Sequence, residues 1–179
     1  MTSSLGDYQQ ARQLQNDTLT RLRRVLGENH FLTLREASLL GLTLGSLGEH
    51  QQARDLHTDA LARSRRVLSE DHPETLRTAS DLGVTLGSMG EQQQGRQLQT
   101  DALVRLRRVL GEDHPDTLTS ANRLAADLRT LGEYERARAF DEDTLARRRR
   151  VLGDDHPDTL TSAGNLAADL RALGEPDDM

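Results

Sequence analysis

The sequence predicts an all-α fold, an α-solenoid of antiparallel helix pairs with about four units, and three observations lead to it. Glycine recurs in steps of 42 residues at positions 6, 48, 90, 132 and 174. Histidine recurs with the same step at positions 30, 72, 114 and 156. Between these positions apolar residues follow one another in steps of three and four, the spacing of one helix face. A fixed period of this size is typical of a solenoid, in which each unit buries its apolar face against its neighbours.

This period sets the expected domain organisation. We expect one array over residues 1–179, with units at 6–47, 48–89, 90–131 and 132–173 and a short acidic tail at 174–179. In this register the array opens with a second-type helix over about 8–26 and closes with a first-type helix over 156–173. A core distributed along such an array argues against a single buried catalytic pocket.

The first helix of each unit is expected to begin just after the repeated histidine. In the third unit Pro115 follows His114, and proline suits a first helical turn because its missing N–H would be unpaired there. The glycine that opens the next unit ends the helix. We therefore predict that the histidines are turn and capping residues. A metal ladder is disfavoured because helix packing places successive copies about 10 Å apart, and one histidine beside two acids is a weak ligand set.

The second helix of a unit is predicted from 134 to 152 in the fourth unit, where Arg147 to Arg150 suit the negative end of the helix dipole. Arginines gather at this place in every unit, and acids follow within a few residues. Local charge compensation on a solvated or paired face is the favoured interpretation, and a docking surface for an acidic partner is the alternative. The clusters are Arg21/Arg23/Arg24, Arg63/Arg65/Arg66, Arg105/Arg107/Arg108 and Arg147–Arg150.

Composition removes several functional classes. The chain has no cysteine, which excludes disulfides, thiolate nucleophiles and cysteine-based zinc sites. A net charge of −6 and an aromatic content of 2% disfavour nucleic-acid binding. No apolar run approaches the length of about 18 residues that crosses a bilayer, and residues 1–5 lack a signal-peptide pattern. We expect a cytoplasmic protein that binds no cofactor and no metal. We also expect that it is not an enzyme, since no catalytic motif is found whose residues could adopt a catalytic geometry.

The residue types at repeated positions resemble those of a known family. The first helices carry small-xx-Leu-small-xx-Leu, as in Ala37, Leu40, Gly41 and Leu44, and the second helices keep a small residue at 11, 53, 95 and 137. These match the tetratricopeptide pattern. The motifs over 132–137 and 107–117 resemble more closely still the 42-residue type found in kinesin light chains and in many actinobacterial proteins. In the first two units Ser38 and Ser80 stand at the place of Asn122, which is a departure from that family.

The resemblance implies a concave groove lined by the first helices. Its asparagine commonly holds the backbone of an extended peptide, because an amide both donates and accepts, and nearby basic residues hold acidic groups. The alternative is that the residues at these positions are ordinary exposed helix residues. Projected onto this chain, the groove residues are Arg35, Ser38, Leu42, Gly45, Arg77, Ser80, Val84, Ser88, Thr119, Asn122, Ala126, Arg129, Thr161, Asn165 and Arg171.

These observations predict a non-catalytic protein–protein interaction scaffold that binds a peptide or helix in its groove. A second hypothesis is self-assembly into a homo-oligomer, since the two terminal helices are of complementary type and would leave matching faces. A third is the sensor repeat segment of a larger signalling ATPase, which similar bacterial arrays often accompany. Gly41-xxx-Gly45 resembles a membrane dimerisation motif, and we expect it to serve close helix packing instead.

Overall fold

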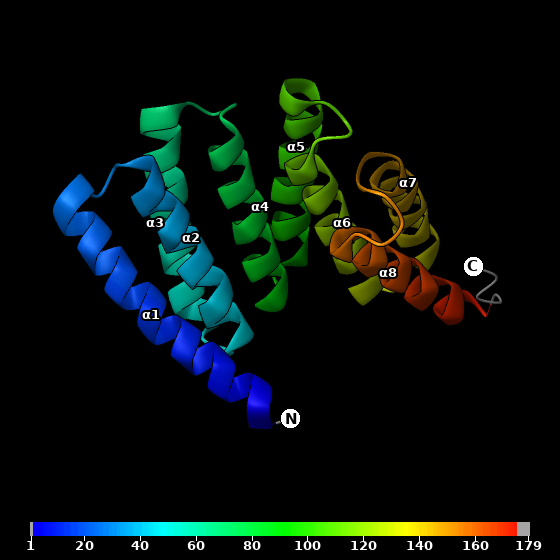
Figure 1. The fold of residues 1–179 in the computed structure, drawn as a ribbon, viewed down its shortest axis with the longest axis horizontal. Helices are drawn as coiled ribbons and strands as arrows, with labels where there is room; N and C mark the ends of the chain where they lie inside the picture. The colour runs from blue at the N-terminus through cyan, green and yellow to red at the C-terminus, as the bar shows by residue number, and fades with distance from the viewer. Residues whose placement is uncertain (1, 175–179) are drawn as a thin grey trace. The chain divides into compact units, whose positions relative to one another are not determined.

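The computed structural model describes residues 2–174 of the 179-residue chain, so the predicted tail lies outside the described residues except for Gly174. The described residues form helices joined by short turns, and they contain no strand. The helices are α1 (Thr2–Leu26), α2 (Phe31–Ser46), α3 (His50–Leu68), α4 (Pro73–Ser88), α5 (Gln92–Leu110), α6 (Pro115–Thr130), α7 (Tyr134–Leu152) and α8 (Pro157–Leu173), as Figure 1 shows. The all-α prediction is confirmed.

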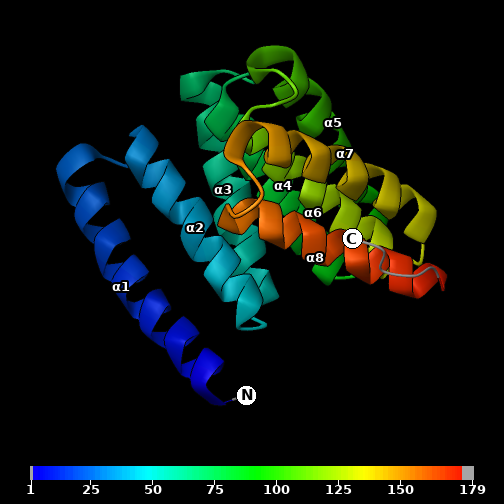
Figure 2. The same ribbon diagram turned by 45° about the vertical axis from the view of Figure 1, so that its right-hand side comes forward.

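The chain divides into two compact units, with the boundary inside α5 between Ala102 and Leu103. From here on, the first and second units are these two parts of the chain, and each 42-residue segment is called a repeat. In the first unit, α1 packs on α2, α2 on α3 and α3 on α4, and α2 also contacts α4. In the second unit, α6 packs on α7, α7 on α8, and α6 contacts α8. Figure 2 shows the antiparallel pairs in each unit from a second direction. A single array over residues 1–179 stays a prediction.

The repeated histidines cap the first-type helices, as predicted. Each has extended backbone and lies at the N-cap position, where its Nδ1 accepts a hydrogen bond from the backbone N–H two residues later. The four donors are Leu32, Glu74, Asp116 and Asp158, at 3.1–3.2 Å. Proline occupies the first turn of α4, α6 and α8. The capping bond satisfies an N–H that the helix leaves without an internal partner.

The glycine turns that were predicted to end the first-type helices are found at all four positions. Gly48, Gly90, Gly132 and Gly174 have φ between 75° and 87°, a left-handed conformation that glycine adopts without steric cost. The first helix was predicted over about 8–26 and begins earlier, because α1 starts at Thr2 and runs through Gly6. Glycine is permissive of helical dihedral angles as well, so nothing local forces a turn there.

Leucine and alanine fill the core of both units. In the first unit the buried cluster is Leu19, Ala37, Leu40, Leu44, Ala53 and Ala60, and in the second it is Leu103, Ala121, Leu124, Ala125, Leu128 and Ala137. The small residues allow close approach of the helices. A Cβ on Gly41 would collide with the His57 ring, 2.7 Å from Cδ2, whereas one on Gly45 would meet nothing within 4 Å. Close packing therefore explains Gly41, and the prediction was wrong for Gly45.

Candidate functional site

A hollow of about 260 Å³ lies on the first unit between α2 and α4, at the start of α3. We call it the α2–α4 hollow. Four of the predicted groove residues lie in its lining: Leu42, Gly45, Val84 and Ser88. Leu42 and Val84 are partly exposed. Its full lining is Gly41, Leu42, Gly45 and Ser46 of α2, His50 of α3, and Val84, Thr85 and Ser88 of α4.

The lining combines aliphatic walls with uncharged polar groups. Ser46 and Ser88 each donate a hydrogen bond to the carbonyl four residues earlier, at 3.1 Å, so their oxygens retain lone pairs for a ligand. His50 Nδ1 is shielded from solvent and has no hydrogen-bond partner among the described residues. The lining contains no carboxylate and no guanidinium. Such a hollow suits a neutral side chain that brings a hydrogen-bond donor or an aliphatic surface.

The missing side chain of Gly45 keeps this hollow open. The residue at the same repeat position in the second unit is Arg129, which is 84 residues, or two periods, further along. Arg129 lies between α6, α7 and α8 with a side chain that is 22% exposed. In the second unit the Arg129 guanidinium thus occupies the place that stays empty in the first unit.

Two buried acids hold Arg129 in the second unit. Its Nη2 lies 2.6 Å from Asp141 Oδ2 of α7, and its Nε lies 2.5 Å from Asp169 Oδ1 of α8. Both carboxylates have no exposed side-chain surface. One cation therefore links three helices through charge-assisted hydrogen bonds to two carboxylates.

A second layer of polar groups extends this arrangement toward the start of α8. The Asn122 amide, oriented so that both of its ends are satisfied, donates to Asp141 Oδ1 (3.3 Å) and accepts from Arg148 Nη1 (2.9 Å) and Ser162 Oγ (3.2 Å). Arg148, only 4% exposed, also donates to the Asp158 carbonyl at 2.9 Å. We call Asn122, Arg129, Asp141, Arg148, Ser162 and Asp169 the Arg129 cluster. Its two arginines and two aspartates balance in charge when all are ionised.

Burial shifts the ionisation of the Arg129 cluster. Desolvation raises the pKa of Asp141 to about 7, and the hydrogen bond with Asp169 acts in the same direction, whereas Arg129 opposes this shift. Burial lowers the pKa of Arg148, with Asp158 and Asp141 acting in the opposite direction. The hydrogen bond to Asp169 raises the pKa of Arg129. Asp141 therefore titrates close to neutral pH, while Arg129 stays charged.

Other residue types occupy the corresponding positions of the first unit. His57 stands where Asp141 stands, and its ring nitrogens contact Thr85 Oγ1 and the Ser38 carbonyl, each at 3.0 Å. Ser38 Oγ donates to Asp81 Oδ2 of α4 at 2.8 Å. His57, Ser38 and Asp81 are all buried. The His57 ring thus contacts Thr85 and lies against Gly41, both of which line the α2–α4 hollow.

The predicted groove residues divide into surface and interior groups. Ser38, Ser80 and most of Asn122 lie inside, so these side chains are not presented to a partner as the resemblance implied. Arg77 pairs with Glu74 at 2.5 Å, and Arg129 belongs to its cluster. The Asn165 backbone accepts from Arg129 at 3.3 Å, and its side chain is half-buried. The exposed members are Arg35, Ser88, Thr119, Ala126, Thr161 and Arg171.

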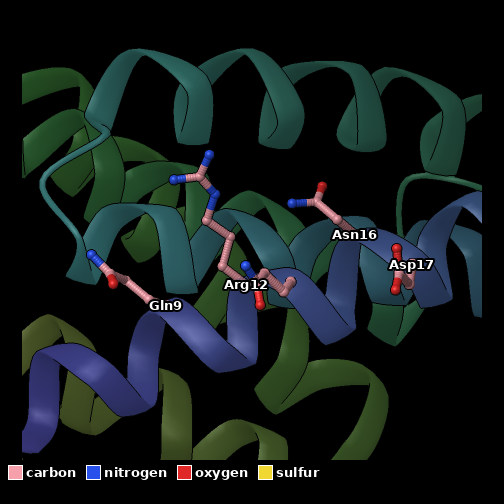
Figure 3. Close-up of a pocket in the computed structure, with 5 residues that line it drawn as sticks. Gln9, Arg12, Asn16 and Asp17 are labelled. Atoms are coloured by element: carbon pink, nitrogen blue, oxygen red, sulfur yellow. The ribbon is translucent and has the colours of Figure 1, made fainter.

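Two further hollows lie on the first unit. One, of about 580 Å³, is lined by Gln9, Arg12, Gln13, Asn16 and Asp17. Figure 3 shows Arg12 and Asn16 projecting from the same side of α1, and Arg12 pairs with Glu49 at 2.5 Å. The other, of about 390 Å³, lies between α1 and α3 and has Leu40 and Leu44 of α2 in its lining. Neither lining brings a nucleophile and a base together, and the described residues hold no group of side chains suited to a metal ion.

Arginines of the clusters at 63–66 and 147–150 form ion pairs, and several of their partners lie one 42-residue repeat earlier. Arg147 contacts Glu112 and lies 3.0 Å from Asp113, and Arg150 lies 2.5 Å from Asp113. In the first unit Arg63 pairs with Glu28 at 2.9 Å. Pairs with the following acids also occur, as the sequence predicted, at Arg65–Glu70 and Arg149–Asp154. Long-range pairing of this kind was not predicted, because adjacency in the sequence suggested only the local partner.

Sequence reasoning missed the polar residues buried inside the second-type helices. His57 and Asp141 occupy one repeat position, and the first of them lies between Ala53 and Ala60 on the buried helix face. A polar residue at that place in a row of small residues was the available signal. The signal at Asp169 was weaker, since its repeat counterparts are Thr43, Thr85 and Asp127, and only the last of them is an acid.

The architecture defines a repeat protein of stacked helix pairs, and comparisons with known proteins identify its family. The sequence profile of the tetratricopeptide repeat matches residues 2–65, 35–103 and 117–158. The chain belongs to the tetratricopeptide repeat family. Tetratricopeptide arrays are protein–protein interaction scaffolds and typically carry no catalytic site, so this chain is an interaction scaffold in that general sense.

Solved structures share the fold at low sequence identity. The crystal structure of BtubC (BKLC) from P. vanneervenii aligns with a TM-score of 0.74 and 22% identity over 97% of this chain and 69% of that one. A putative kinesin light chain from Podosopora anserina, with nearly identical TPR-like repeats, aligns at 0.67 and 24% over 94% and 80%, and a singly substituted form of it aligns at 0.69 and 24%. No curated protein sequence matches the chain significantly. Within the described residues, no helix combines the length and apolarity needed to cross a membrane.

Proposed function

We propose that the chain binds an extended peptide or helix along the first-type helices, and that the α2–α4 hollow receives a neutral side chain of that ligand. One observation carries the proposal: at this repeat position the first unit has Gly45 and open space, whereas the second unit has Arg129, whose side chain is held between helices. The aliphatic Leu42 and Val84 supply contact area, and the hydroxyl oxygens of Ser46 and Ser88 supply hydrogen-bond acceptors.

The charged groups in and around the α2–α4 hollow restrict the kind of side chain that the ligand can place there. A guanidinium or ammonium group would lose hydration in the hollow without a carboxylate to replace it, so a basic side chain is disfavoured. Arg35 lies on α2 seven residues before Leu42, hence on the same helix face, and it is exposed. A ligand with an aliphatic or amide side chain, followed by an acid at the distance of Arg35, fits this surface.

A display library of short random peptides provides the probe, since it samples many side-chain combinations and does not require that the natural partner be identified. The affinity of enriched peptides is measured by fluorescence anisotropy on the purified chain and on two variants. Gly45→Leu fills the hollow, and Gly164→Leu places the same side chain on α8, where a Cβ also meets nothing within 4 Å. We expect Gly45→Leu to weaken binding at least about tenfold and Gly164→Leu to leave it unchanged. Peptides that bind both variants equally well would contradict the proposal.

A further inference from the structure

One face of α8 lacks the cover that the same face has on the other first-type helices. Leu160 is 59% exposed, whereas its repeat counterparts Leu34, Leu76 and Leu118 are 2–3% exposed. Two of these counterparts lie on α2 and α6, which pack against the second-type helices α3 and α7. Within residues 2–174, no second-type helix follows α8 to cover Leu160 in this way.

The opposite face is uncovered on α1. Thr18 is exposed, whereas its counterparts Ala60, Ala102 and Thr144 are 0–2% exposed. Leu14, one turn earlier, is 62% exposed. In α3 and α7 this face packs against the first-type helix that precedes it in the chain, and among the described residues α1 has none. The two uncovered faces are thus the two halves of one recurring helix pair.

The charged groups around these faces are complementary in the same register. Arg147 and Arg150 pair with Glu112 and Asp113 of the preceding 42-residue repeat. The counterparts of these arginines on α1 are Arg21 and Arg24, which are exposed and have no ion pair within residues 2–174. The counterparts of the two acids are Asp154 and Asp155, which are exposed at the start of the loop before α8.

A buried polar atom on α1 points to the same contact. Gln15 Oε1 is shielded from solvent and has no hydrogen-bond partner among the described residues. Gln15 occupies the repeat position of Asp141, which accepts a hydrogen bond from Arg129. The counterpart of Arg129 one period later is Arg171 on α8. An arginine placed against Gln15 as Arg129 is placed against Asp141 would satisfy this oxygen.

We propose that the chain binds a second copy of itself head to tail, with α8 of one copy packed against α1 of the other as α6 is packed against α7. In this contact Leu160 is covered, Arg171 donates to Gln15, and Arg21 and Arg24 lie against Asp154 and Asp155. The contact joins two different surfaces, so it leaves one free copy of each surface and can propagate. It uses no residue of the α2–α4 hollow and is independent of the peptide proposal.

The test measures the mass of the purified chain by light scattering after size-exclusion chromatography across a concentration series. We expect the mass to rise above 19.9 kDa as concentration increases. Leu160→Asp blocks the α8 face and Thr18→Arg blocks the α1 face, and each should raise the dissociation constant at least about tenfold. Both positions are exposed, so neither change disturbs the core. Val104→Asp, at a 60% exposed position of α5, is the matched control and should not alter the mass.

Mixing the two blocked variants gives the sharpest outcome. The Leu160→Asp chain keeps an intact α1 face and the Thr18→Arg chain keeps an intact α8 face, so their mixture should form dimers and nothing larger. Charge reversal of Arg21 and Arg24 to Glu should weaken association, and reversal of Asp154 and Asp155 to Arg in the other chain should restore it. A mass of one chain at every concentration would overturn the proposal, as would association that both blocking variants leave unchanged.

Discussion

Arg129 Nη2 and Asp141 Oδ2 lie 2.6 Å apart between α6 and α7, and this contact is the centre of the charged core of the second unit. Asp169 of α8 accepts a hydrogen bond from Nε of the same guanidinium at 2.5 Å. Neither carboxylate has exposed side-chain surface, so hydrogen bonds and charges within the Arg129 cluster must offset their lost hydration, and Arg129 is the cation that both share. Removal of the cation should therefore cost more than removal of a surface arginine.

Arg129→Ala is expected to destabilise the chain by about 3–5 kcal/mol, because it leaves two buried carboxylates without their counter-ion. Urea unfolding followed by circular dichroism measures the change. Arg136→Ala is the control: Arg136 pairs with Glu133 from a 62% exposed position, and its loss should cost less than about 1 kcal/mol. Similar losses for the two variants would show that the cluster is not a buried ion network.

The elevated pKa of Asp141 makes stability depend on pH in a defined direction. Its pKa is about 7 in the folded chain against an ordinary value of 3.8, so the folded state binds more protons than the unfolded state between these values. The contribution of Asp141 to stability is therefore full below about pH 4 and is lost as pH rises through 7. Asp141→Asn, which cannot titrate, should flatten the curve of unfolding free energy against pH over this window. An unchanged slope would assign the titration to other groups.

Gly41→Ala should destabilise the first unit by about 1–3 kcal/mol, the usual cost of overpacking. The added Cβ would lie 2.7 Å from His57 Cδ2, and that ring is held by Thr85 and the Ser38 carbonyl. Gly45→Ala, one turn along the same helix, meets open space and should gain about 0.5–1 kcal/mol through reduced flexibility of the unfolded chain. Thermal melts of the two variants should thus move in opposite directions.

Ser69 adopts a backbone conformation that its repeat counterparts leave to glycine. Its φ is 90° and its ψ is 165°, whereas Gly27, Gly111 and Gly153 have φ of 87–90°. For residues with a Cβ this region costs about 1–3 kcal/mol. Ser69→Gly should raise the midpoint of thermal unfolding, and the reverse change, Gly111→Ser, should lower it. A lower midpoint for Ser69→Gly would mean that the serine side chain stabilises the turn by more than this strain.

The helices could be predicted from the sequence because their determinants are local and repeated. The bounds of α7, Tyr134–Leu152, follow from an apolar face that begins after one glycine turn and ends at the next. The histidine caps follow from the residue types around each first turn. The predicted start of the first helix near residue 8 was wrong, because the helix already includes Gly6 and begins at Thr2.

The arrangement of side chains inside the site could not be predicted from the sequence. It depends on how far each side chain reaches and how deeply it is buried, and a periodic pattern gives neither. Ser38 and Asn122 occupy the predicted face, yet both side chains point between neighbouring helices, where Asp81 and Ser162 bind them. Leu42 and Val84 stay on the surface and line the α2–α4 hollow. The hollow itself follows from a difference between units, glycine at 45 and arginine at 129, whose meaning depends on the partners of that arginine.

The pairs Arg12–Glu49 and Arg54–Glu91 repeat one contact at a shift of one period. In each pair the arginine lies on a second-type helix, and the glutamate lies in the turn that opens the next 42-residue repeat. Arginine and glutamate recur at these two positions at each junction between repeats. A gene that gains or loses a segment coding for one whole period would therefore produce a chain in which the contacts at the new junction already exist. The length of the array can change in whole steps during evolution, and each repeat can then vary its surface while the junctions stay constant.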